Sequence, residues 1–142
     1  MDTSRPKVSF HHTLGVRVTR KHKDGVTVEC LLHAGLLNGK GVAHGGVIAA
    51  IVDEAAWYAI EHRVGRARDA TTTELKVNYL RPLAGKKATA RAILLRARKT
   101  LCVARVDLKD AHRRLAAVAI VAYMLLGPRS PRRVPYNSED AV

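Results

Sequence analysis

A histidine–glycine–glycine turn followed by a carboxylate within an apolar run is the part of this sequence best suited to chemistry. His44, Gly45 and Gly46 stand directly before an apolar segment that holds Asp53. Glycines at the start of a helix leave backbone N–H groups bare at its positive end, where they can bind a developing negative charge. A carboxylate further along the same helix can act as a base. Together these groups are what the attack of water on an activated carbonyl requires.

Asp53 falls on a helix face where a carboxylate needs a partner or a function. At 100° per residue it lies between Ala49 and Trp57, among small and apolar side chains, whereas Glu54 and Glu61 fall together on a wetter stripe. A carboxylate among apolar side chains loses hydration, which favours a functional role. The structural alternative is an aspartate at an interface, tied to a backbone group or an arginine.

The distance along this helix predicts a shared site. Gly45 and Asp53 are eight residues apart, which is roughly 12 Å of helix, so one carbonyl cannot touch both groups of the same helix. If both act on one substrate, we expect a homodimer with two antiparallel helices side by side, and each site takes Gly45 from one subunit and Asp53 from the other. The imidazole of His44 is either a polar loop residue or a group that binds substrate or holds the loop. Gly45 and Gly46 favour the second interpretation, because they leave the helix start open to close approach.

The elements that must position these residues are two strands, one long helix and four more strands. Apolar periodicity and turn residues predict strands over 14–20, 26–32, 71–79, 87–97, 101–109 and 115–125, a helix over 45–62, a loop over 33–43 and turns at 23–25 and 109–112. One helix that is apolar nearly all round has to be enclosed. The expected fold class is therefore α+β, a curved antiparallel sheet wrapped around the helix. We expect a single domain over 1–142 with a core over about 14–126, and loose segments over 1–12 and 127–142.

The charge of the chain indicates an anionic partner. Its 142 residues, enough for one domain, carry 25 Lys and Arg against 12 Asp and Glu, which gives a net charge of +13. No Asp or Glu occurs from Leu75 to Val106, so one region is strongly basic. Nucleic acid, a membrane surface and a phosphorylated small molecule would all suit it, and a solvated basic sheet face is the structural alternative. The 4% aromatic content and the lack of a recognition motif argue against nucleic acid.

The cysteines and the termini give two further expectations. Cys30 and Cys102 lie in separate apolar segments without ligand spacing, so we expect both to be buried apolar side chains and no metal site. No apolar run resembles a signal peptide or is long enough to span a bilayer. We therefore expect a cytoplasmic protein that does not associate with membranes.

The chain resembles the hotdog-fold acyl-CoA thioesterases, in particular the PaaI-like branch of the phenylacetate pathway. The resemblance rests on Asn38, the His44-Gly45-Gly46 turn and Asp53 at their spacing, and on the later segment Thr-Thr-Glu-Leu-Lys-Val-Asn-Tyr-Leu-Arg-Pro over 72–82. It covers about 14–126. It implies a curved sheet of about six strands around one central helix. It also implies hydrolysis of an acyl-CoA to a carboxylic acid and CoA, with no cofactor other than the CoA of the substrate.

The resemblance implies a role for each matching catalytic residue. The N–H of Gly45 would polarise the thioester carbonyl, and Asp53 would act as general base or as nucleophile. Asn38 and His44 would orient water or the thioester. A hydroxyl at the start of the next strand would assist the carboxylate, most simply that of Thr72, with Thr71 and Thr73 as alternatives.

The resemblance also implies a binding surface for CoA. Gly46 would line the thioester site, and Asn78 would lie near the pantetheine. The phosphates would meet three cations: Arg81, Arg98 and Lys99. A Gly-Arg pair that is common in the family is replaced here by Arg98-Lys99-Thr100, which changes the local turn but keeps the positive charge. The family commonly pairs dimers, so a dimer of dimers is a possible assembly.

Three other functions fit parts of the sequence. A hotdog module could bind acyl-CoA or a protein partner without turnover, a basic domain could bind nucleic acid, and a dehydratase can use the same fold. The presence of Asp53, His44 and the two glycines together favours the hydrolase over a binding module.

Overall fold

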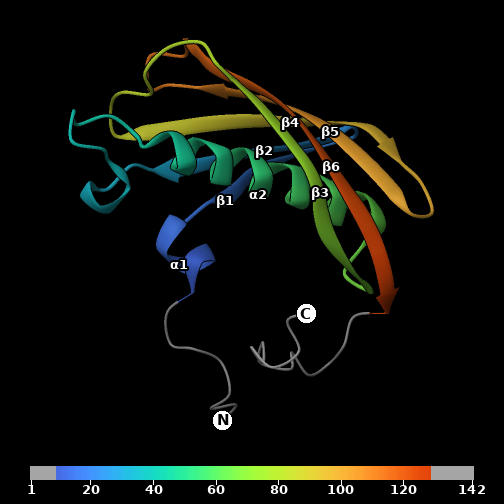
Figure 1. The fold of residues 1–142 in the computed structure, drawn as a ribbon. Coiled ribbons are helices and arrows are strands. Elements are labelled where there is room, and N and C mark those ends of the chain that lie inside the picture. Colours follow the sequence, from blue (N-terminus) through green and yellow to red (C-terminus); the bar gives the residue numbers. More distant parts are fainter. Residues whose placement is uncertain (1–8, 129–142) are drawn as a thin grey trace.

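One long helix lies in the concave face of a curved, six-stranded antiparallel sheet (Figure 1). The computed structural model describes residues 9–128. Its elements in chain order are α1 (Phe10–Leu14), β1 (Arg17–His22), β2 (Gly25–Leu31), a 3-10 turn (Ala34–Leu36), α2 (Gly45–Val64), β3 (Arg68–Tyr79), β4 (Lys87–Ala97), β5 (Leu101–Lys109) and β6 (Leu115–Pro128). The α+β fold expected from the sequence, with six strands and one central helix, is confirmed.

The strand order is β1-β2-β4-β5-β6-β3, and every neighbouring pair is antiparallel. The strand that follows α2 in the chain, β3, therefore lies at the edge and has β6 as its partner. Tyr79 at the end of β3 pairs with Ala117 near the start of β6. The edge position of β3 matters for the site, because Thr72 lies on this strand and Arg81 lies just beyond its end.

The sequence at each end of α2 explains where the helix begins and stops. His44 is the N-cap, and its side chain accepts a hydrogen bond from the Gly46 N–H. Gly65, with φ of +79°, ends the helix and donates its N–H to Glu61 O. The helix packs mainly on β2, β4 and β5 and buries only aliphatic side chains: Ile48, Ile51, Val52, Ala55, Ala56, Ala59 and Ile60. Within residues 9–128 no helix is long and apolar enough to cross a membrane.

Several predicted boundaries need correction. The segment over 1–12 was expected to be loose, yet Phe10–Leu14 form α1, which is capped by Ser9 and ended by Gly15 in the left-handed region. As a result, the first strand begins at Arg17 rather than at Leu14. The loop over 33–43 contains the 3-10 turn, and β3 begins three residues earlier than expected. The strand β6 continues to Pro128, into the expected tail, and the rest of both terminal segments lies outside the described residues.

The core is built from aliphatic residues with little aromatic help. Cys30 and Cys102 are 1% and 0% exposed and form no disulfide, which confirms them as buried apolar side chains. The Cys30 thiol donates a hydrogen bond to Leu14 O at 3.2 Å. Burial raises its pKa to about 11, with the nearby charge of Glu54 acting in the same direction. A thiol held in this way is a poor nucleophile at neutral pH.

Candidate active site

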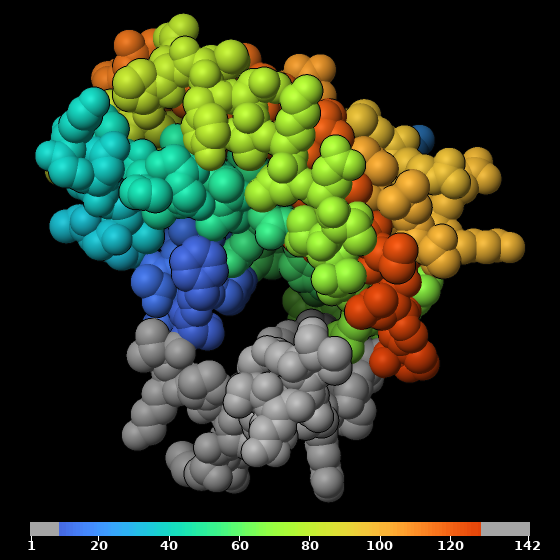
Figure 2. Space-filling model, in the orientation of Figure 1, coloured from blue at the N-terminus to red at the C-terminus, as the bar shows by residue number. Residues whose placement is uncertain are grey.

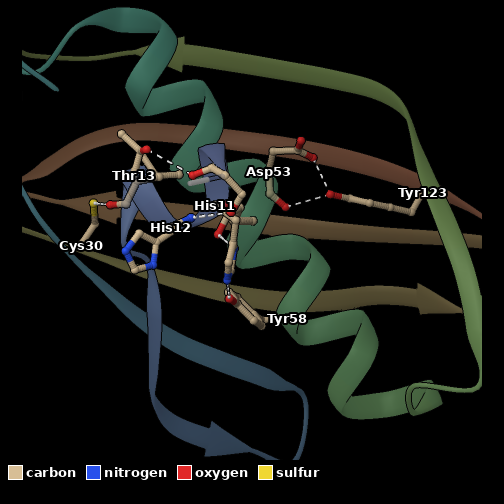
Figure 3. A network of polar contacts seen from close by, with 10 residues as sticks. His11, His12, Thr13, Cys30, Asp53, Tyr58 and Tyr123 are labelled. Carbon is tan, nitrogen blue, oxygen red and sulfur yellow. Dashed lines mark hydrogen bonds and ion pairs between the residues drawn. The ribbon is translucent and has the colours of Figure 1, made fainter. Parts of the chain in front are cut away.

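Two hydroxyl groups hold one oxygen of the Asp53 carboxylate. Thr72 Oγ1 donates to Asp53 Oδ1 at 2.9 Å, and the Tyr123 hydroxyl donates to the same oxygen at 2.7 Å. The Tyr123 hydroxyl also lies 3.1 Å from the Asp53 backbone oxygen, and the two side chains face one another in Figure 3. Within residues 9–128, Asp53 Oδ2 receives no hydrogen bond. One oxygen is thus fixed, and the other is available to a water molecule or a substrate.

Tyr123 is the residue of this cluster that the sequence analysis missed. Its side chain is 6% exposed, and its ring lies 5.8 Å from that of Trp57, one turn beyond Asp53 on α2. Burial raises the pKa of the Tyr123 phenol far above its usual range, and the Asp53 carboxylate acts in the same direction. The phenol therefore stays protonated and acts as a donor. The sequence carried one clue. Tyr123 alternates with the residues of an apolar strand so that it faces the core, where a hydroxyl needs a hydrogen-bond partner.

The structure distinguishes the three adjacent threonines. Thr72 donates to Asp53 and Thr73 Oγ1 donates to Ala122 O at 3.3 Å, whereas the Thr71 hydroxyl makes no hydrogen bond within residues 9–128. A shift of register between Thr72 and Glu74 in the pairing of β3 with β6 accompanies this arrangement. Such bulges re-aim side chains, so counting alternate residues along the strand could not identify the threonine that faces α2.

The helix start offers one free N–H group. His44 Nδ1 accepts from the Gly46 N–H at 2.9 Å, so the cap uses the donor of Gly46. A Cβ on Gly46 would come within 3.1 Å of His44 Nδ1, and the cap therefore favours glycine there. Among residues 9–128 nothing accepts the N–H of Gly45. The oxyanion donor expected at Gly45 is available, while His44 holds the loop.

Asn38 organises the loop that precedes the helix. Its Oδ1 accepts from the backbone N–H groups of Lys40, at 2.9 Å, and Val42, at 3.4 Å. Leu37 and Ala43 form an isolated antiparallel bridge, and His44 N donates to Leu36 O at 3.0 Å. The oxygen of the amide is thus used within the loop, and only the NH₂ group of Asn38 remains for a ligand.

The start of α2 is anchored to the end of β3. The Tyr79 hydroxyl donates to Gly45 O at 2.8 Å, and its ring atoms lie 3.7 Å from the position of a Cβ on Gly45. Asn78 and Arg81 flank this contact in the chain. The sequence motif over 72–82 includes Tyr79 but predicts no role for it, because nothing local to it indicates a contact with a residue 34 positions earlier.

The expected phosphate cations are divided between the two ends of β3. Arg81 lies two residues beyond Tyr79, the last residue of the strand. Lys99 lies at the other end, where Arg68 Nη1 donates to Lys99 O at 2.6 Å and Arg68 Nε donates to Leu126 O at 2.8 Å. A strand of this length separates its ends by roughly 35 Å. Within one chain, Arg81 therefore cannot act on the same phosphate as Arg98 and Lys99.

Glu54 and Glu61 do not lie on a wet stripe, so that expectation was wrong. Their side chains are 17% and 14% exposed, because α1 covers the first and Arg66 covers the second. Glu54 Oε2 pairs with His11 Nδ1 at 3.0 Å, and His11 Nε2 hydrogen-bonds to Tyr58 at 3.1 Å. Burial raises the pKa of Glu54, as does the charge of Asp53, against the opposing effect of His11. Figure 3 shows His11 and Tyr58 close together, whereas Asp53 faces Tyr123.

Residues 9–128 contain no group of three or more His, Cys, Asp or Glu side chains arranged to hold a metal ion. The groups of the site that could do chemistry are the carboxylate, the hydroxyls and the helix start. These groups form two clusters. Asp53, Thr72 and Tyr123 make the first, and Gly45, with His44 and Tyr79 around it, makes the second about 12 Å along α2.

Comparisons with known proteins agree with this architecture. The Thioesterase superfamily model matches residues 40–117. A Saccharolobus solfataricus protein named as an inferred esterase, SSO2140, is 33% identical over 113 residues, which is 80% of each chain. The medium/long-chain acyl-CoA thioesterase YigI of Escherichia coli K12 is 29% identical over 134 residues, 82% of this chain and 84% of YigI.

Solved structures show the same fold. Thioesterase HI1161 of Haemophilus influenzae has a TM-score of 0.80 at 20% identity over 89% of each chain. The PaaI protein of E. coli, from the phenylacetic acid degradation operon, has a TM-score of 0.73 at 23% identity, covering 83% of this chain and 84% of PaaI. The family match, together with one helix enclosed by a six-stranded antiparallel sheet, leads to one conclusion: the chain belongs to the hotdog-fold thioesterase superfamily, with PaaI among its structural neighbours.

Proposed function

We propose that this protein is an acyl-CoA thioesterase that hydrolyses its substrate to a carboxylic acid and CoA. The observation that carries the proposal is the Asp53 carboxylate, with one oxygen fixed by Thr72 and Tyr123 and the other without a donor in the described chain. A carboxylate held in this way has a defined direction in which to take a proton. The similarity to YigI, named as a medium/long-chain acyl-CoA thioesterase, supports the choice of substrate class.

In the proposed mechanism, Asp53 Oδ2 accepts a proton from a water molecule as the water oxygen bonds to the thioester carbonyl carbon. The carbonyl oxygen becomes an oxyanion and receives a hydrogen bond from the Gly45 N–H at the positive end of a helix. The intermediate then breaks its C–S bond, and the proton on Asp53 passes to the departing sulfur. Direct attack by Oδ2 on the carbonyl carbon is a second route open to the same geometry. Neither route needs a cofactor or a metal ion.

The exposed edge of β3 supports a site shared by two subunits. In the described chain β3 has β6 on one side and no strand on the other, and an unpaired edge of this length readily pairs with a second copy. In a two-fold antiparallel pairing, the end of one β3 lies beside the start of the other. Gly45, held at Tyr79, would then approach the partner subunit's cluster at Thr72 and Asp53. This arrangement supports the homodimer expected from helix length.

The same two-fold pairing would bring the divided cations together. Arg81 of one subunit would lie at the strand end that carries Arg98 and Lys99 of the other. We therefore propose that all three cations bind the phosphates of CoA. Asn78 would lie beside the pantetheine, and Gly46 would line the thioester site. A further pairing of dimers is supported by outward-facing apolar side chains on neighbouring strands, 40–47% exposed: Leu101, Ile120, Met124 and Leu126.

A thiol-release assay over aryl-CoA and alkyl-CoA esters tests the function. We expect Asp53→Asn to lower kcat by at least about 100-fold, as is typical for the loss of a general base. Asp107→Asn is the matched control, since Asp107 pairs with Arg105 on β5 and lies outside the site. Unchanged turnover in a folded Asp53→Ala protein would rule the mechanism out.

The competing function is an acyl-CoA-binding module without turnover. It would show itself as saturable binding of an acyl-CoA to the wild-type protein with no thiol released over hours. The two free cysteines suit a reducing compartment, and we place the proposed reaction in the cytoplasm.

A further inference from the structure

The first peptide unit of α2 is held at both of its ends. The carbonyl of Gly45 and the N–H of Gly46 belong to this one planar unit. The Tyr79 hydroxyl donates to Gly45 O at 2.8 Å, and the Gly46 N–H donates to His44 Nδ1 at 2.9 Å. Figure 2 shows the yellow-green surface at the end of β3 beside the blue-green surface at the start of α2. One side chain of the cap and one of a distant strand therefore set the orientation of this unit.

The preceding peptide unit carries the N–H of Gly45, the proposed oxyanion donor. The other end of this unit, His44 O, accepts from the N–H groups of Val47 at 2.9 Å and Ile48 at 3.1 Å. The two planar units meet at the Cα of Gly45, where only φ and ψ can rotate. With both units held, the free N–H of Gly45 keeps one direction relative to the helix.

Two adjacent glycines make the helix start dependent on contacts from outside it. Gly45 and Gly46 have no side chains, so their backbone loses more conformational entropy on folding than that of any other residue type. Helix ends also open locally at a low cost in free energy. Tyr79 can oppose this opening because its own backbone is fixed. The next residue, Leu80, donates its N–H to Ala116 O at 2.8 Å.

We propose that Tyr79 is a positioning residue, which aims the Gly45 N–H at the oxyanion of the thioester intermediate. The proposal rests on the proposed function and concerns the donor half of that site. Tyr79 bonds to the carbonyl of Gly45 and leaves its N–H to the substrate. A donor stabilises an oxyanion only at about 2.7–3.1 Å from it, so a helix start that fluctuates loses part of this stabilisation. The barrier to hydrolysis then rises, with little effect on substrate binding.

The hydroxyl of Tyr79 can be removed without the ring by Tyr79→Phe. The residue is 54% exposed and adds little to the core, and the Ala43 N–H still donates to Leu83 O at 3.1 Å, which keeps the loop attached. We expect kcat to fall about tenfold and KM to change less than about twofold. Tyr58→Phe is the matched control, because its hydroxyl contacts His11, and its kcat should stay within about twofold of wild type. Equal kcat values for the two variants would overturn the proposal.

A double-variant cycle shows whether Tyr79 acts through the Gly45 N–H. Gly45→Pro removes that N–H, and its residual kcat, about 1% of wild type or less, can be measured at high enzyme concentration. With no donor left to position, adding Tyr79→Phe to Gly45→Pro should change kcat less than about twofold. A further loss of about tenfold in the double variant would mean that the two substitutions act independently. That result would place the effect of Tyr79 elsewhere and reject the positioning role.

Amide hydrogen exchange measured by NMR separates this proposal from the thioesterase itself, because it requires no turnover. We expect the Gly46 N–H to exchange at least about fivefold faster in Tyr79→Phe than in wild type, and at an unchanged rate in Tyr58→Phe. Faster exchange in a protein that hydrolyses no thioester supports the ordering of the helix start by Tyr79 and rejects the thioesterase. Unchanged exchange and unchanged kcat in an active enzyme reject the positioning role and leave the thioesterase intact.

Discussion

At the residue scale, the arrangement of hydrogen-bond donors decides which oxygen of Asp53 can react. Both hydroxyls act on Oδ1, one from the edge strand β3 and one from its neighbour β6. A carboxylate held by a single donor could rotate and exchange its oxygens. With two donors on one oxygen, Oδ2 keeps its direction, which is the positional accuracy that proton transfer needs.

Tyr123→Phe tests the importance of the second donor. The substitution removes a hydroxyl 2.7 Å from Asp53 Oδ1 and keeps the ring against Trp57. We expect kcat to fall about 10- to 100-fold with little change in KM, since a hydrogen bond to a charged group is lost. Tyr58→Phe is the control, because its hydroxyl contacts His11 and not Asp53. Wild-type kcat in a folded Tyr123→Phe protein would remove Tyr123 from the mechanism.

The neighbouring threonines provide a matched pair of variants. Thr72→Val removes the donor to Asp53 and should lower kcat about tenfold or more. Thr73→Val removes a hydroxyl that donates to Ala122 O, so it should cost a little stability and leave kcat within about twofold. Initial rates at saturating thioester, with thermal melts of both variants, make the comparison. A larger loss from Thr73→Val than from Thr72→Val would contradict the observed geometry.

The candidate site could be predicted in part because some of its residues are neighbours in the chain. Asp53, Gly45 and His44 follow from residue types on one helix and the turn before it. Tyr123 could not be found in the same way, since it is 70 positions from Asp53 and meets it only because β6 lies beside β3. Thr72 stayed one of three candidates, because a shift of register in the pairing of β3 with β6 decides which threonine faces α2.

At the element scale, the turn between β5 and β6 depends on one buried carboxylate. Asp110 is 2% exposed, and its Oδ1 accepts from the N–H groups of His112 and Arg114 at 2.9 and 3.0 Å. Its Oδ2 accepts from Arg114 Nε at 2.8 Å. Burial tends to raise the pKa of Asp110, but these hydrogen bonds outweigh it and hold the pKa below the usual value.

This turn should give the fold a defined pH dependence. A carboxyl whose pKa is lower in the folded state stabilises the fold above its unfolded pKa, and that stabilisation is lost as the pH falls through the folded pKa. We therefore expect Asp110→Asn to be less stable than wild type at pH 7, and the difference to shrink below about pH 4. Urea unfolding at several pH values measures this. A difference that does not change between pH 7 and pH 3 would show that the charge of Asp110 is unimportant.

The order of the elements could be predicted, because each element has a clear periodicity. The contacts between elements that are distant in the sequence could not be predicted. The alternating runs located all six strands and the apolar run located α2 to within a few residues. The helical wheel placed Glu54 in water, since a wheel does not include α1, which lies over that face and supplies His11. The cations were expected to form one group, and the length of β3 divides them.

At the scale of the whole molecule, a shared site makes a prediction about mixtures of two inactive variants. Gly45→Pro removes the proposed donor with little other change: Gly45 is the first helical residue, where proline is tolerated. His44, with φ of −59° and ψ of 140°, already has the conformation that precedes proline. Asp53→Ala removes the base. Each variant alone should be nearly inactive.

Unfolding and refolding the two variants together should restore activity. In a random mixture of dimers, half are mixed, and one of the two sites in each mixed dimer has an intact Gly45 and an intact Asp53, so about one quarter of all sites are complete. Gly45→Ala is the control, because it keeps the N–H and its Cβ would lie at an ordinary 3.7 Å from Tyr79. Mixed dimers verified by mass spectrometry that stay inactive would place both groups of each site in one subunit.

The edge position of β3 also has a consequence for how the chain is made. Its one neighbour in the described sheet, β6, is completed roughly fifty residues later, which at about 5–20 residues per second is roughly 2 to 10 seconds of translation. During that time β3 has no strand beside it, and Asp53 lacks the Tyr123 hydroxyl. The emergence of β6 from the ribosome would then attach β3 to the sheet and supply the second donor to Asp53, so that a nascent chain acquires its last strand and its carboxylate geometry together.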